Sequence, residues 1–231
     1  MKINETHHAD VLVEFFHELT TRFGEKGLYA FRKGSQLYGE SRGRRMALRA
    51  LRDGHELDYD SYFAYGEFSS TPGEAEYLMK AEPGLVKENA VKCLWAKEFA
   101  ERGCKECGRV YCRQIDNAVA RGFNPDLELE VLCNMHDDGE CIFLYRDERI
   151  TRDSLDSQKR LLKPGQNVKL PMEYHTAEVY LMMEHVVNAV FPKESPDVIA
   201  QVRERLAGRH GDEFLKLLDS YRNTDFLMIP E

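Results

Sequence analysis

The chain has 231 residues and a formal net charge of −8, with 42% hydrophobic and 31% charged residues. This composition is typical of a globular protein with a well-solvated surface, and the length is sufficient for a sizeable core. The acidic balance argues against nucleic acid as a partner. No apolar run approaches the roughly 18 residues of a membrane span, so no membrane partner is expected. The N-terminus lacks the apolar core of a secretory signal, which predicts a cytoplasmic protein.

Two helices are expected first. Apolar residues follow a helical spacing over 6–23, and Gly24 is a suitable stop. A second helix is expected over about 25–52, ending at Asp53-Gly54. Residues 55–73, rich in Tyr, Phe, Ser and Gly, are predicted to form a loop.

The middle of the chain predicts two hairpins and two helices. Segments 76–82 and 85–93 are expected to pair across Pro83-Gly84. Helical character follows at 94–100 and 106–121. The alternating segments 127–131 and 141–145 are expected to pair across the turn at 134–139.

The character of the sequence changes near residue 150. A charged segment, 149–160, and a linker, 163–167, precede helices expected at about 173–190, 195–207 and 212–221. The predicted fold class is α+β: a small antiparallel sheet packed with helices, plus a C-terminal helical extension. We expect an α+β domain over 1–148 and the extension over 149–231.

All six cysteines lie between residues 93 and 141. Clustered thiols in a chain without an export signal indicate metal-binding, catalytic or redox residues rather than disulfides. The competing interpretation of any one of them is a small buried hydrophobic residue. Cys104 and Cys107 form a C-x-x-C motif, which both redox and zinc sites use.

Helix 106–121 carries a candidate catalytic group. Arg109, Cys112 and Asp116 share one helix face, where the arginine would favour a thiolate. The competing interpretation is a buried cysteine beside a surface ion pair.

A candidate metal site surrounds the second hairpin. Glu130, Cys133 and Cys141 flank its turn, and Cys112 from the helix would complete a thiolate-rich set of the kind zinc prefers. Residues 130 and 133 point to opposite faces of a regular strand, so a shared metal requires a bulge or an early turn. His136 is a competing ligand. Zinc is therefore the candidate cofactor, and no nucleotide or organic cofactor is indicated.

Arginines repeat along one face of the second helix, at Arg42, Arg45, Arg49 and Arg52. The first three are candidates to bind a substrate carboxylate, because the guanidinium fork matches that group. The competing interpretation is a solvated helix face. In the extension, His175, Glu178 and His185 lie on one helix, which we interpret as a surface pattern.

From about residue 23 to 146 the order of short motifs resembles the L-2-amino-thiazoline-4-carboxylic acid hydrolase family. Five short segments carry the resemblance: Gly39-Glu40-Ser41-Arg42-Gly43-Arg44-Arg45, Val91-Lys92-Cys93-Leu94-Trp95-Ala96, Tyr111-Cys112-Arg113-Gln114-Ile115-Asp116, Gly122-Phe123-Asn124-Pro125-Asp126-Leu127 and Asp138-Gly139-Glu140-Cys141-Ile142-Phe143. The chain has Cys93-Leu94 where members usually have Cys-Pro. The resemblance implies that water adds at carbon 2 of a thiazoline ring and that the C–S bond breaks. It also implies that Cys93, Cys112, Asp116 and Cys141 are the family's recurrent residues.

A more distant resemblance is to the 4-vinyl-reductase-type ligand-binding domain. In that domain a helix-end Cys and a Glu-x-x-Cys-x7-Cys hairpin hold zinc, which implies the same role for Cys112, Glu130, Cys133 and Cys141.

Two functions follow. The first is a small-molecule hydrolase that opens a C–N/C–S heterocycle, with Cys93 or Cys112 as nucleophile or metal ligand and Asp116 as base or as the group that orients the thiol. The alternative is a non-catalytic, zinc-organised small-molecule-binding module, whose extension docks a partner or forms a homodimer.

Overall fold

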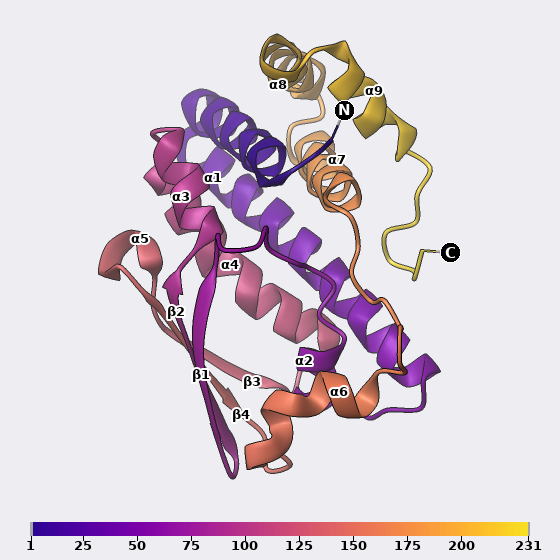
Figure 1. Cartoon of the computed structure of the whole chain (residues 1–231). Coiled ribbons are helices and arrows are strands. Elements are labelled where there is room, and N and C mark those ends of the chain that lie inside the picture. The colour runs from indigo at the N-terminus through magenta and orange to yellow at the C-terminus, as the bar shows by residue number, and fades with distance from the viewer. Residues whose placement is uncertain (1, 231) are drawn as a thin grey trace. The chain divides into compact units, whose positions relative to one another are not determined.

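The computed structural model describes residues 2–230 and contains helices and one four-stranded antiparallel sheet, which confirms the α+β class (Figure 1). The elements in chain order are α1 (Glu5–Arg52), α2 (Tyr59–Ala64), β1 (Glu76–Glu82), β2 (Leu85–Lys92), α3 (Leu94–Glu101), α4 (Lys105–Phe123), β3 (Glu128–Cys133), α5 (Met135–Asp138), β4 (Cys141–Arg146), η1 (Arg152–Asp156), α6 (Ser157–Leu161), α7 (Met172–Val190), α8 (Ser195–His210) and α9 (Asp212–Ser220).

The contacts divide the chain into two compact units, each built from three segments. Unit 1 comprises Met1–Tyr38, Trp95–Gln114 and Pro171–Thr224, and unit 2 comprises Gly39–Leu94, Ile115–Leu170 and Asp225–Glu231. This division differs from the predicted boundary at 148/149, because the last three helices pack with the start of the chain. The predicted α+β domain over 1–148 and the extension over 149–231 stay a prediction.

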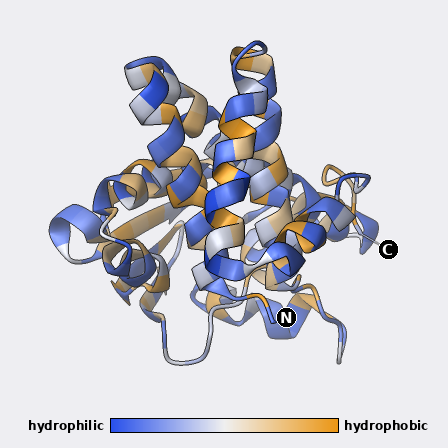
Figure 2. Ribbon diagram, turned by 90° about the horizontal axis from the view of Figure 1, so that it is seen from above, coloured by the Kyte–Doolittle hydropathy of each residue, from blue (hydrophilic) through white to orange (hydrophobic). Residues whose placement is uncertain are grey.

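Unit 1 is helical. It contains α3, α7, α8 and α9 with the first parts of α1 and α4. Gly24 interrupts α1 with a φ of 54°, a left-handed conformation that glycine adopts without steric cost, which confirms the predicted break between two helices. In Figure 2 apolar and polar residues alternate along the helical ribbons, as amphipathic helices require.

Ion pairs tie the start of α1 to the other helices of unit 1. Asp10, which is 4% exposed, accepts from Arg102 at 2.6 Å and contacts His210 at 2.9 Å. Glu14 and Glu18, equally buried, pair with Arg209 and Arg205 of α8, each at 3.0 Å. These acidic residues are therefore internal partners rather than a solvated surface.

Unit 2 contains the sheet, whose strand order is β1-β2-β4-β3. Both predicted hairpins are confirmed, and β4 joins them by pairing with β2 as well as β3. Val86, Ala90, Phe143 and Tyr145 are buried and define the inner face of the sheet. The last part of α1 and the last part of α4 belong to the same unit.

Glycines allow these last parts of α1 and α4 to approach closely. A Cβ added to Gly43 would lie 2.0 Å from the carbonyl oxygen of Val119, and one added to Gly122 would lie 2.2 Å from that of Glu40. No side chain fits there, because the obstructing atoms are backbone. The Gly39–Arg45 and Gly122 motifs are thus explained as a helix–helix contact.

The shortest helices of the structure were not predicted from the sequence. The segment predicted as a loop contains α2, which begins at the N-cap Asp58, and the predicted turn at 134–139 contains α5, capped by Asn134. The charged segment forms η1 and α6. Among residues 2–230, no helix combines the length and apolar character that crossing a bilayer requires.

Candidate active site

A carboxylate lies on the inner face of the sheet in unit 2. Side chains alternate along β2, so Glu88 points to the same face as the buried residues Val86 and Ala90. Its register partner on β4 is Phe143, another inner-face residue. Glu88 was not among the predicted site residues. The available signal was a charged residue at an inward position of an alternating strand.

A second carboxylate comes from α4. Asp116 lies one position after Ile115 and is partly exposed, while its helical neighbours Ile115, Ala118 and Val119 are buried. The close approach of α1 to α4 at Gly39 and Gly43 holds Arg42 near this carboxylate. The Arg42 guanidinium favours ionisation of Asp116, whereas burial opposes it more strongly and raises the pKa of Asp116 from 3.8 to about 6.

The two carboxyl groups influence each other. Burial, with a further contribution from the Asp116 charge, raises the pKa of Glu88 from 4.5 to about 7. Asp116 therefore loses its proton first, and Glu88 keeps its proton over the interval between these two values. Such a pair supplies a base and an acid at the same pH, which is the arrangement that general acid–base catalysis uses.

A pocket of about 260 Å³ is lined by one carboxylate of this pair, Glu88. Its lining includes Arg42, Tyr62, Glu67, Glu88 and Lys169. The volume lies just below the roughly 300–1,000 Å³ of pockets for drug-sized ligands, so the pocket suits a small metabolite. Burial, with a further contribution from Arg42, lowers the pKa of Lys169, whose ammonium donates to the carbonyl oxygen of Gly66. Two cationic side chains, Arg42 and Lys169, and two carboxylates, Glu67 and Glu88, thus line one pocket.

Three tyrosines lie near Glu88. Burial is the largest cause of the raised pKa values of Tyr59, Tyr62 and Tyr145, and the Glu88 charge contributes to each. Tyr59 is 1% exposed, and its hydroxyl has no hydrogen-bond partner in the structure. This poorly solvated environment is the reason why Glu88 and Asp116 hold protons so strongly.

The three predicted substrate-binding arginines have different positions. Arg45 and Arg49 are buried and donate to the Glu67 carboxylate, and Arg45 also donates to the carbonyl oxygen of Phe226. Arg42 lies 3.8 Å from Glu67 and lines the pocket. The interpretation of a solvated helix face is therefore wrong for this stretch. Of the three predicted substrate-binding arginines, Arg42 lines the pocket and can contact a ligand. Arg45 and Arg49 are held in an internal ion-pair network.

Two of the predicted cysteines belong to the same unit as the pocket. Cys93 follows β2 and is partly exposed, and Cys141 begins β4 and is buried. Burial raises the pKa of Cys141 to about 12, with smaller contributions from Cys93 and Asp116. The Cys141 sulfur accepts a hydrogen bond from the Met135 amide at 3.1 Å. Cys141 is therefore a neutral thiol in this environment, which is a poor nucleophile.

Cys112 lies in the part of α4 that belongs to unit 1 and is partly exposed. The arginine expected to favour its thiolate, Arg109, forms an ion pair with Glu106 one turn earlier. Sequence neighbours on α4 are thus divided between the two units, with Cys112 in unit 1 and Asp116 in unit 2.

The hairpin residues of the predicted metal set do not converge. A bulge between Val131 and Cys133 occurs where a shared metal would require one. Glu130 and Cys133 nevertheless pair with Leu144 and Ile142, on the face opposite to the one Cys141 occupies. Glu130 is exposed and lies 3.8 Å from Arg146. As placed, Glu130, Cys133 and Cys141 do not fit a zinc ion, and zinc binding stays a prediction.

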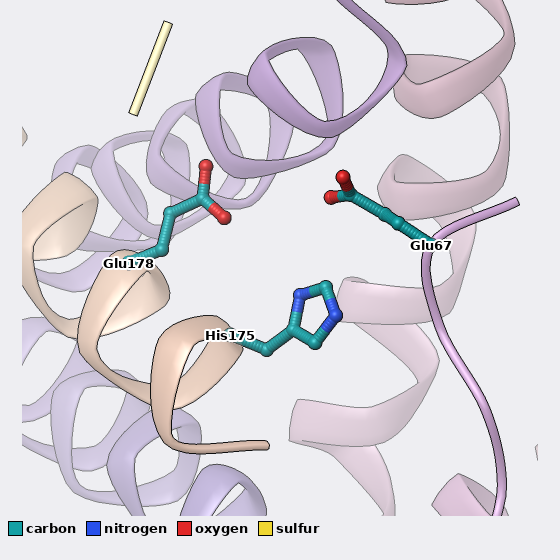
Figure 3. A group of neighbouring side chains, drawn as sticks. All are labelled: Glu67, His175 and Glu178. Atoms are coloured by element: carbon teal, nitrogen blue, oxygen red, sulfur yellow. The ribbon is translucent and has the colours of Figure 1, made fainter. Parts of the chain in front are cut away.

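His175 and Glu178 of α7 were interpreted as part of a surface pattern. Both side chains are 0% exposed, so the assignment to a surface pattern is wrong. Figure 3 shows them projecting from successive turns of α7. Within unit 1, a ring nitrogen of His175 lies 3.3 Å from the Tyr38 hydroxyl. The figure also draws Glu67 of unit 2, the partner of Arg45. The sequence signal was available, since Glu178 lies among the apolar residues of α7.

Comparison with known proteins identifies the family. No curated protein and no solved structure matches the chain. The family model described as L-2-amino-thiazoline-4-carboxylic acid hydrolase matches residues 4–143, more than half of the chain. This span includes Asp116, the pocket residue Glu88 and the motifs that bring α1 against α4. The chain belongs to the L-2-amino-thiazoline-4-carboxylic acid hydrolase family.

Proposed function

We propose that the chain hydrolyses a small heterocycle of the thiazoline type that carries a carboxylate, and that the reaction takes place in the pocket of unit 2. The observation that carries this proposal is the pair of carboxyl groups Asp116 and Glu88, whose pKa values are raised to about 6 and about 7, and of which Glu88 lines a pocket of about 260 Å³. The family name gives the substrate class.

In the proposed reaction Asp116 acts as the base. Its carboxylate removes a proton from water as the oxygen attacks carbon 2 of the ring, the carbon bonded to both nitrogen and sulfur. The C–S bond then breaks with its electron pair on sulfur. Glu88 donates its proton to that sulfur. The second proton of the water passes from the new hydroxyl to the ring nitrogen as the C=N bond becomes C–N, so the product carries a new C=O group and a free thiol. A proton passing from Asp116 to Glu88 through solvent restores the pair.

The cations of the pocket suit the substrate carboxylate. Arg42 can form the two parallel hydrogen bonds that a carboxylate accepts from a guanidinium, and Lys169 adds a second positive charge. The ion pairs of Glu67 with Arg45 and Arg49 stabilise the helix turn that presents Arg42. Arg45 and Arg49 are in this proposal positioning residues.

The thiols have a secondary place in this proposal. Cys141 stays neutral at the pH at which Asp116 and Glu88 differ in protonation, because burial holds its pKa at about 12. Cys93 is the remaining candidate nucleophile in unit 2. A covalent route through Cys93 would form a thioester-like intermediate at carbon 2, whereas direct attack by water would not.

The test is turnover of L-2-amino-thiazoline-4-carboxylate by the purified full chain, followed by release of a titratable thiol. Asp116→Asn and Glu88→Gln are each expected to reduce kcat by 10²-fold or more. Glu101→Gln, a change of an exposed carboxylate at the end of α3, is the matched control and should keep full activity. Full activity of Asp116→Asn, or activity that depends on Cys93 alone, would refute the assignment of the carboxylate pair.

A further inference from the structure

The C-x-x-C motif lies at the start of α4, in unit 1, and the proposed hydrolysis does not use it. Cys104 immediately precedes the first helical residue, Lys105, so it occupies the N-cap position. The amide and the thiol of Cys107 both donate to the Cys104 sulfur. The two sulfur atoms are therefore direct neighbours.

This arrangement stabilises a thiolate at one cysteine and a thiol at the other. The hydrogen bond from the Cys107 thiol is the largest cause of a lowered Cys104 pKa, about 6, and the Cys107 amide adds to it. Burial, followed by the same hydrogen bond, raises the pKa of Cys107. Amides at a helix N-terminus favour negative charge, so Cys104 replaces the carboxylate or hydroxyl that commonly caps a helix.

A metal does not explain the pair. Within residues 2–230, no third histidine, cysteine or carboxylate atom completes a cluster of ligand atoms with these two sulfurs. Two thiols with different acidity and direct contact are instead the usual elements of a redox pair, in which one attacks an oxidant and the other resolves the product.

We propose that Cys104 and Cys107 form a reversible disulfide, with Cys104 as the thiol that attacks a small hydroperoxide and Cys107 as the resolving thiol. Cys104 is 4% exposed and Cys107 is 0% exposed, which favours a small oxidant over a protein partner. The Cys104 thiolate attacks one oxygen of hydrogen peroxide, the O–O bond breaks, and the hydroxide leaving group takes up a proton and departs as water; an organic hydroperoxide would release an alcohol in its place. The Cys107 sulfur then attacks the resulting sulfenic acid, forming the S–S bond and releasing a second water. The two thiols lose two electrons and two protons, and the peroxide is reduced.

The first experiment uses the full chain with hydrogen peroxide under native conditions, followed by alkylation and tryptic mapping. Trypsin cuts after Arg102, Lys105 and Arg109, so the disulfide joins peptide 103–105 to peptide 106–109. We expect two of the six thiols to disappear and to return with dithiothreitol. A disulfide between other cysteines, or six thiols that resist peroxide until the protein is denatured, would overturn the proposal.

Variants separate the roles of the two sulfurs. Cys104→Ser keeps a residue that caps helices well, so the fold is retained while peroxide consumption is lost. Cys107→Ser should leave a sulfenic acid on Cys104, trapped with dimedone. Cys133→Ser, in unit 2, is the control and should form the same disulfide as the unaltered chain. A dimedone adduct at another cysteine in Cys107→Ser would also count against the assignment.

Discussion

Replacing Glu88 with glutamine should stabilise the protein at alkaline pH and leave its stability unchanged in acid. The pKa of Glu88 in the folded chain is about 7, against 4.5 for an unperturbed glutamate, because burial and the Asp116 charge disfavour the ionised form. Since one pKa unit corresponds to about 1.4 kcal/mol, the ionised glutamate costs the fold about 3 kcal/mol.

The direction follows from proton binding. Between pH 4.5 and 7 the folded state holds a proton on Glu88 that the unfolded state has released, so stability falls as the pH rises through this window. Glutamine has the shape of the protonated acid and does not ionise. Glu88→Gln should therefore match the unaltered chain below about pH 4.5 and exceed it above about pH 7, by about 3 kcal/mol.

Thermal unfolding measured from pH 4.5 to 8.5 tests this difference. For a chain of this length, 3 kcal/mol corresponds to a rise of roughly 6–12 °C in Tm. The control variant Glu101→Gln, at an exposed position, should follow the unaltered chain at every pH. Parallel curves for Glu88→Gln and the unaltered chain, with no divergence between pH 4.5 and 7, would refute the burial argument for Glu88.

The remaining predictions concern activity, packing and metal. The kcat/KM profile should be bell-shaped with limbs near pH 6 and 7, the acid limb set by Asp116 and the alkaline limb by Glu88; a flat profile over pH 5–8 contradicts this. Glu67→Ala removes a partner of the buried Arg45 and should cost about 3–5 kcal/mol in urea unfolding, and a loss below 1 kcal/mol would show that the ion pair is dispensable. Gly43→Ala places a Cβ against backbone atoms of α4 and should destabilise the protein by about 2 kcal/mol or more, whereas Gly208→Ala, with no heavy atom within 4 Å, should stabilise α8 by about 0.5–1 kcal/mol. Chelation should leave Tm unchanged, because Cys141 lies on a different face from the other hairpin ligands; one zinc per chain together with a lower Tm after chelation would favour the binding-module alternative.

Local patterns in the sequence were sufficient for most elements. Helix periodicity, strand alternation and the glycine at position 24 depend on nearest neighbours along the chain, and the structure confirms both hairpins and the long helices. The short helices α2 and α5 were missed because four to six residues carry too little periodicity, and their caps, Asp58 and Asn134, were the available signals.

The sequence by itself determined the α+β class and the family motifs, and it singled out Asp116 as a candidate site residue. Only the tertiary structure decided that the Asp116 charge acts on Glu88, because the two carboxylates lie 28 positions apart in the sequence, one on a helix and one on a strand. It also decided that Arg45 turns toward Glu67 while Arg42 lines the pocket. Helical spacing shows which residues share a face, but the neighbours that cover that face, and the solvent they exclude, come from distant segments.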